Sequence, residues 1–403
     1  MGVVQRKLTN TFNKFFESEK SSGILIIACT AVSLLFTNSI LGENYLSIWH
    51  GYIGGMSVEH WINDGLMAVF FFLIGLELKR ELLVGELSEL RNALLPIFAA
   101  IGGVVLPAAI HFGLNFGTPT QAGIGIPMAT DIAFALGALA LLGSRVPASL
   151  KIFLTALAVI DDLMAIIVIA VFYTAELSII YLGSGLAIFV LLLGLNYLGG
   201  VKRMTPYLLG GFLLWYLMLQ SGVHATIAGV LAAFTIPFSP DGDEENSPSH
   251  RLEHLLHKPS AFVILPIFAL ANTGIIIGGD WFEGLSESNS LGIIFGLVAG
   301  KPIGITLACF ITVTLGICRL PLDLNWKHVF GAGLLGGIGF TMSIFITNLA
   351  FTGNAEIINA SKMAILLASL TAGTAGFLWL KLLGKPETGD EDMSTMDFEA
   401  VNN

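Results

Sequence analysis

The chain has 403 residues, of which 55% are hydrophobic and only 12% are charged, and its mean hydropathy is +0.81. Soluble domains contain about a quarter charged residues, so the composition excludes a soluble globular protein. Disordered, collagen-like and nucleic-acid-binding proteins are excluded by the same figures. The net charge of -10 comes mainly from segments 241–245 and 387–399, which we interpret as solvated. The composition predicts an all-α polytopic membrane protein.

In chain order, the sequence begins with a basic amphipathic segment, 1–20, expected to lie at the cytoplasmic membrane surface. A single helical domain, 21–385, and an acidic cytoplasmic tail, 386–403, are predicted to follow. Crossing a bilayer takes about 20 apolar residues. On this basis we predict twelve transmembrane helices, near residues 22–40, 61–78, 92–114, 122–143, 149–174, 178–200, 204–220, 222–238, 259–277, 289–316, 327–350 and 357–383. Residues 45–58 predict a small hairpin around Gly54 and Gly55.

The basic residues are distributed on one side of these predicted spans. All but two of the 19 Lys and Arg residues lie in the termini or in alternate connections, and the exceptions, Lys301 and Lys362, lie inside spans. The connections on the other side contain no Lys or Arg. Because cytoplasmic loops carry the excess of basic residues, we expect both termini in the cytoplasm and the chain in the inner membrane of a bacterium.

Four ionisable residues lie where the bilayer should exclude them. Asp131 is in the fourth predicted span, Asp161 and Asp162 are in the fifth, and Lys301 is in the tenth. An ionisable group at the bilayer centre costs at least about 3 kcal/mol, so these side chains must face protein or water. A buried salt bridge that orients helices is the structural alternative. Such pairs rarely stabilise a protein more than apolar packing does, and we therefore favour a functional role.

The adjacent pair Asp161 and Asp162 has the chemistry of an exchange site. Neighbouring helical residues point about 100° apart, so one carboxylate can face a cavity while the other reaches a partner helix. Lys301 is the cation at comparable depth. Carboxylate oxygens accept protons and are also ligands for hard cations. A site that holds either protons or a small cation, but not both, is the physical basis of ion–proton exchange.

The fourth and eleventh predicted spans both contain helix-breaking residues. Gly123, Gly125 and Pro127 precede Asp131, and five glycines between 331 and 339 precede Thr341. Paired interruptions of this kind, in spans 3–5 and 10–12, are typical of an inverted repeat in secondary transporters. Half-helix ends carry partial charges. Asp131 could therefore neutralise the positive ends and Lys301 the negative ends, which for Asp131 is as good an explanation as ion binding.

These residues and the strings around them resemble the NhaA family of bacterial Na+/H+ antiporters. The matching strings lie at 71–81, 129–137, 154–163, 221–226, 251–257, 300–304 and 337–343. They cover about residues 20–383 in the family's order. The resemblance implies export of Na+ or Li+ in exchange for entering H+, by an electrogenic and pH-regulated cycle. It also implies two interrupted, crossing helices, a homodimer in the lipid bilayer, and no cofactor or nucleic-acid partner.

The resemblance further implies roles for individual residues. Asp161 and Asp162 form the cation- and proton-binding pair, with Asp162 as the main Na+ ligand and Asp161 alternating between a proton and a salt bridge to Lys301. Thr130 and Asp131 lie at the helix crossing. The residues implied in the pH response are Glu77, Arg80, Glu81, Glu253, His254 and His257, with His224 as a further candidate. From the residues alone, a solvated helix end and ordinary packing of His224 remain open.

Two other classes of protein were weighed. An intramembrane aspartyl protease also uses two buried carboxyl groups, but its usual Gly-x-Gly-Asp string is missing because Met128, Ala129 and Thr130 precede Asp131. A sodium-coupled symporter for organic anions, built on a related broken-helix fold, is the stronger alternative. It requires a second substrate site and has no evident use for a buried Lys–Asp pair. The sequence therefore predicts a secondary ion transporter rather than an enzyme.

Overall fold

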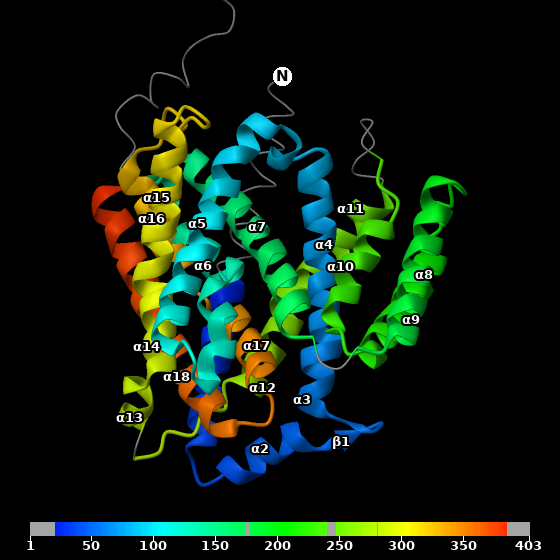
Figure 1. The fold of residues 1–403 in the computed structure, drawn as a ribbon, viewed down its shortest axis with the longest axis horizontal. Helices are drawn as coiled ribbons and strands as arrows, with labels where there is room; N and C mark the ends of the chain where they lie inside the picture. Colours follow the sequence, from blue (N-terminus) through cyan, green and yellow to red (C-terminus); the bar gives the residue numbers. More distant parts are fainter. Residues whose placement is uncertain (1–20, 175–176, 240–246, 280, 385–403) are drawn as a thin grey trace, which may run out of the picture.

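The computed structural model describes residues 21–174, 177–239, 247–279 and 281–384, and within these ranges the chain is almost entirely helical (Figure 1). The predicted amphipathic segment 1–20 and the acidic tail 386–403 lie outside the described residues. After a first helix, Ser21–Thr37, the longer helices are α4 (Met67–Leu83), α5 (Leu90–Asn115), η3 (Pro119–Met128), α6 (Ile132–Leu142), α7 (Ala148–Phe172), α8 (Ile179–Tyr197), α9 (Thr205–Ser221), α10 (Thr226–Thr235), α11 (Pro248–Pro259), α12 (Leu265–Asn272), α14 (Ser288–Phe295), α15 (Lys301–Thr314), α16 (Trp326–Gly336), α17 (Phe340–Ala350) and α18 (Ala355–Leu383).

Short elements connect or extend these helices. They are α2 (Gly42–His50), β1 (Tyr52–Ile53), β2 (Met56–Ser57), α3 (Val58–His60), η1 (Trp61–Leu66), η2 (Glu86–Ser88), η4 (Gly143–Arg145), η6 (Ser260–Ile264), α13 (Trp281–Ser286) and η7 (Gly296–Gly300). Strands β1 and β2 pair antiparallel around Gly54 and Gly55, both of which have positive φ. This confirms the predicted hairpin, which lies beside α2 at the bottom of Figure 1.

Among the described residues, eight continuous helices are long and apolar enough to cross a membrane, or up to ten if each of two bent pairs is counted as one span. The ninth predicted span, 259–277, is wrong at both ends, because the helix runs over Pro248–Asn272. The Ser247 hydroxyl accepts a hydrogen bond from the His250 amide and starts the helix early. The eighth predicted span, 222–238, is also too long, since α10 has only 10 residues.

Both predicted interruptions are present. Between η3 and α6, Ala129–Asp131 leaves the helical conformation, with ψ of 146° at Ala129 and 100° at Asp131. Between α16 and α17 the axis bends by 47°. The two breaks contact each other, because the Asp131 amide donates to the Ile338 carbonyl at 2.6 Å. Segments about 200 residues apart in the chain therefore meet where neither is helical.

The helices form two groups. In the first, here called the α5 group, α5 packs against α15, η3, α14 and α7, and α18 packs against α16, α14 and α17. In the second, the α4 group, α4 packs against α10 and α11, α9 packs against α8 and α10, and α12 contacts η1. Figure 1 shows the α4 group to the right of the α5 group. The seam between the groups includes contacts of α4 with α7 and of α12 with α17.

Within the α5 group, α5 and α15 approach so closely that their backbones touch. A Cβ atom added at Gly102 would lie 2.2 Å from the Gly304 carbonyl oxygen, and one added at Gly304 would lie 2.1 Å from that of Gly102. Small residues permit this close packing in membrane proteins. Gly304 lies about one turn beyond Lys301, so the contact also fixes the position of the lysine.

Candidate ion-transport site

A buried ion pair joins α7 to α15. The Lys301 ammonium lies 2.6 Å from Asp161 Oδ2, and both side chains are completely buried. The ammonium also donates to the carbonyl of Met128, the last residue of η3. Lys301 follows η7 directly, a π-helical turn that determines the direction in which the side chain leaves the helix. The ammonium thus links an acid on α7 with the C-terminal end of the first half-helix.

Asp131 lies at the N-terminal ends of two half-helices. Its Oδ1 accepts from the Phe134 amide and caps α6, while its Oδ2 accepts from the amide of Thr341, at 2.9 Å, and from the Thr341 hydroxyl, near the start of α17. Helix N-termini carry partial positive charge and unpaired N–H groups. One buried carboxylate therefore serves two helix ends, as expected for the neutralising role of Asp131.

Thr130 connects the ion pair to the second break. Its hydroxyl lies 2.6 Å from Asp161 Oδ2 and 2.8 Å from the carbonyl oxygen of Gly336, the last residue of α16. A hydroxyl has a single hydrogen, so it donates to one of these oxygens at a time. The Thr130 hydroxyl can therefore respond to the protonation state of Asp161.

Asp162 lies next to this ion pair but does not join it. Its side chain is buried, and its Oδ2 has no hydrogen-bond partner among the described residues. The carboxylates of Asp161, Asp131 and Glu77, together with the Lys301 ammonium, act on it electrostatically. A buried carboxylate oxygen without a partner is unfavourable unless it gains a proton or a cation. The structure thus brings Thr130, Asp131, Asp161, Asp162 and Lys301 together.

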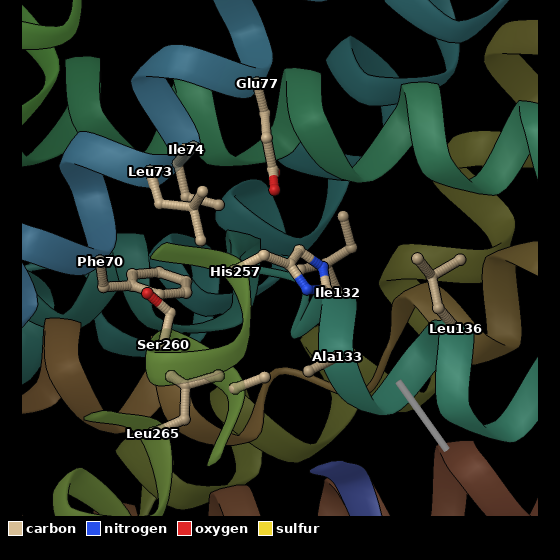
Figure 2. A pocket seen from close by; sticks show the side chains of 11 residues that line it. Phe70, Leu73, Ile74, Glu77, Ile132, Ala133, Leu136, His257, Ser260 and Leu265 are labelled. Atoms are coloured by element: carbon tan, nitrogen blue, oxygen red, sulfur yellow. The ribbon is translucent and has the colours of Figure 1, made fainter. Parts of the chain in front are cut away.

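Nearer the C-terminal end of α4, the residues implied in the pH response are only partly brought together. Arg80 bridges Glu81 and Glu253, at 2.9 Å to each. Glu77 and His257 line a cavity of about 50 Å³ between α4, α6 and α11, and Figure 2 shows both side chains directed toward this space. His254 is exposed at the surface.

His224 lies elsewhere. It contacts Asp64 at 3.0 Å, and His60 contacts the other oxygen of the same carboxylate at 2.9 Å. By a rise of about 1.5 Å per residue, Asp64 is roughly 20 Å from Arg80 along the helix. The structure therefore does not place His224 in the Arg80 cluster. Sequence reasoning missed Asp64, although an acid inside the second predicted span was itself a signal.

The fold and the site define a class of protein. Helices long enough to span a membrane enclose two touching helix breaks, and at that contact three buried carboxylates face one ammonium. This is the arrangement of a secondary transporter for ions.

Comparison with known proteins identifies the family. Residues 13–380 match the family model described as "Na+/H+ antiporter 1". The chain is 69% identical to the Na(+)/H(+) antiporter NhaA of Dechloromonas aromatica over 94% of its own length and 98% of the relative's. It is 56% identical to that of Cytophaga hutchinsonii, over 96% and 98% of the two chains. The chain belongs to the NhaA family of Na+/H+ antiporters. It is a multi-pass secondary transporter of the bacterial inner membrane that exchanges Na+ for H+, and not an enzyme.

Proposed function

We propose that the exchange takes place at Asp161 and Asp162, with Asp162 as the main ligand of Na+. The observation that carries this proposal is the unpartnered, buried Oδ2 of Asp162 beside the Asp161–Lys301 ion pair. Na+ and H+ compete for the Asp162 carboxylate. Asp161 takes a proton when its ion pair with Lys301 opens, and the Thr130 hydroxyl then donates to Gly336. No cofactor is needed, because every step is a movement of ions or protons.

The same geometry supports an electrogenic cycle. Two carboxylates can accept two protons, whereas the site holds one monovalent cation. Each cycle in which two protons enter and one Na+ leaves moves one net charge inward. Li+, a smaller hard cation with the same preference for oxygen ligands, is proposed as a second exported ion.

The finer architecture is also proposed. The ten spans found by length become twelve if α9, with 17 residues, and α10 also cross the membrane. The interrupted spans η3–α6 and α16–α17 are proposed to cross where Asp131 meets Ile338. The distribution of basic residues supports cytoplasmic termini. A homodimer embedded in lipid is proposed on family resemblance, and the Arg80–Glu253 cluster with Glu77 and His257 is proposed as the cytoplasmic pH-responsive region.

The symporter alternative is not favoured, because the Lys301–Asp161 pair has a use in ion–proton exchange and none in that mechanism. The test uses inside-out vesicles from cells without other antiporters. Respiration acidifies the lumen, Na+, Li+ or K+ is added, and a pH dye is read. We expect alkalinisation with Na+ and Li+ but not with K+, and none with Asp162→Asn. Normal exchange by Asp162→Asn at saturating Na+ would refute the site assignment.

A further inference from the structure

Three asparagine side chains form a hydrogen-bonded chain across the seam between the two helix groups. The Asn348 Nδ2 of α17 donates to Asn272 Oδ1 of α12 at 2.6 Å, and Asn272 Nδ2 donates to Asn63 Oδ1 of η1 at 2.9 Å. α17 belongs to the α5 group, whereas α12 and η1 belong to the α4 group. The Asn272–Asn348 contact is thus a direct polar link between the two groups.

The directions of these hydrogen bonds are fixed by the network. Asn272 Nδ2 also donates to the Phe268 carbonyl at 3.0 Å, which orients its amide so that the oxygen faces Asn348. The Asn272 side chain is fully buried, and both its nitrogen and its oxygen have partners. Separating α17 from α12 would leave these buried groups unpaired, which is costly in an apolar surrounding.

One face of α17 leads from the ion site to this asparagine pair. Thr341, which binds Asp131, is followed one turn later by Phe345 and then by Asn348, and residues three or four apart share a helix face. The Phe345 ring contacts the rings of Phe71, Phe268 and His224, which belong to the α4 group or the segment before α10. An aromatic layer and then an amide layer therefore close this side of the site.

The opposite side of the site is not closed in the same way. There the cavity lined by Glu77 and His257 lies between α4, α6 and α11 (Figure 2). By the distribution of basic residues, the cavity faces the cytoplasm and the asparagine pair faces outward. The structure thus has one side with space for water and one side held shut by side chains of both groups.

We propose that Asn272 and Asn348 form an outward clasp, which holds the outer side of the transporter shut and must part before Asp162 can exchange ions with the outside. This inference rests on the proposed function, in which the site alternates between two faces. Neither residue touches the transported ion, so both are positioning residues. They set the ratio of inward-facing to outward-facing protein.

A weakened clasp has an asymmetric kinetic signature. Losing one net hydrogen bond shifts such an equilibrium by about fivefold. Apparent affinity on each face is the intrinsic affinity multiplied by the fraction of protein that faces that side. If the outward-facing state is scarce, Asn348→Ala should lower the apparent KM for Na+ on the outer face by about fivefold. On the inner face, where most of the protein already faces, KM should rise by less than about twofold.

The experiment measures Na+-dependent exchange in right-side-out and inside-out vesicles. Asn289→Ala is the matched control, because Asn289 is also a buried amide with two hydrogen bonds, to His111 and Ser361, yet both partners lie within the α5 group. We expect opposite KM changes on the two faces for Asn348→Ala and none for Asn289→Ala. Equal changes on both faces, or a loss of maximal rate alone, would overturn the clasp. Wild-type exchange that does not depend on Asp162 would instead refute the proposed function.

A second measurement does not require the clasp to be weakened. In a chain whose Cys29, Cys309 and Cys318 are replaced by alanine, the double variant Asn272→Cys with Asn348→Cys can be bridged by Hg2+, which binds two thiolates. We expect the bridged protein to bind Na+ from the inner face but to exchange none, with recovery when dithiothreitol removes the metal. Neither single-cysteine variant should respond to Hg2+. Continued exchange by the bridged protein would exclude an outward clasp at this position.

Discussion

The Asp131 carboxylate accepts a hydrogen bond from the backbone amide of Thr341, 2.9 Å away and 210 residues further along the chain. Through the Phe134 amide the same carboxylate also caps α6. Two interrupted spans are therefore stabilised by one side chain, and its replacement should disturb both.

Asp131→Ala should remove two helix caps at once. Each lost cap costs about 1 kcal/mol, so we expect a loss of about 2 kcal/mol in unfolding free energy, measured by chemical denaturation in detergent. Asp131→Asn retains one acceptor oxygen, and asparagine is itself a good N-cap, so it should lose less. If both variants are equally unstable, the charge of the carboxylate matters more than its hydrogen bonds.

The Asp161–Lys301 pair predicts non-additive mutations. Asp161→Asn alone strands a buried ammonium, which typically costs about 3–5 kcal/mol, whereas Asp161→Asn with Lys301→Gln removes both charges and should recover most of the stability. The double variant should also lose the dependence of transport on membrane potential. Thermal unfolding and transport at imposed potentials test the two parts. An unchanged voltage dependence would remove the pair from the coupling mechanism.

The backbone contact between α5 and α15 predicts a strong steric effect. Gly102→Ala would place its Cβ against the Gly304 carbonyl and should sharply lower the yield of folded protein. Gly113→Ala is the matched control on the same helix, since nothing lies within 4 Å of its added Cβ. Alanine is favoured over glycine in a helix by about 0.5–1 kcal/mol, so Gly113→Ala should be neutral or stabilising. Size-exclusion chromatography and a melting temperature separate these outcomes.

The Arg80 cluster predicts which residues affect the pH response. Glu253→Gln removes one of the two carboxylates that Arg80 contacts, and the loss of a negative charge makes deprotonation of neighbouring groups easier. We expect the midpoint of the activity–pH profile to move to lower pH. His254→Ala, which alters an exposed side chain, should leave the profile unchanged. Equal shifts for both variants would show that the response is not organised by Arg80.

Much of this architecture could be predicted because apolar runs, glycines and buried charges leave direct signals in the sequence. Pro127 and its neighbouring glycines located the first break, and the basic residues gave an orientation. Hydropathy failed at Pro248–Asn272 because the first turns of that helix carry Arg251, Glu253 and Lys258. A helix that is amphipathic at one end and apolar at the other has no single hydropathy signature.

The partners of individual side chains were harder to predict. The Met128 and Gly336 carbonyls that receive Lys301 and Thr130 are backbone atoms, which sequence patterns do not distinguish. The separation of His224 from the other histidines depends on how α10 packs against α4. These features follow from tertiary contacts between distant segments.

The π-helical turn η7, Gly296–Gly300, determines where the Lys301 ammonium points. Its hydrogen bonds run from i to i+5, so the turn contains one residue more than an α-helical turn. Each residue of a helix advances the direction of the next side chain by about 100°. Deleting one residue from η7 would therefore keep the lysine in the sequence but turn it onto a different face of α15, away from Asp161. The charge partnership depends on residue count as well as on residue identity, so two chains with the same lysine and the same aspartate would differ in function if their turns differed in length.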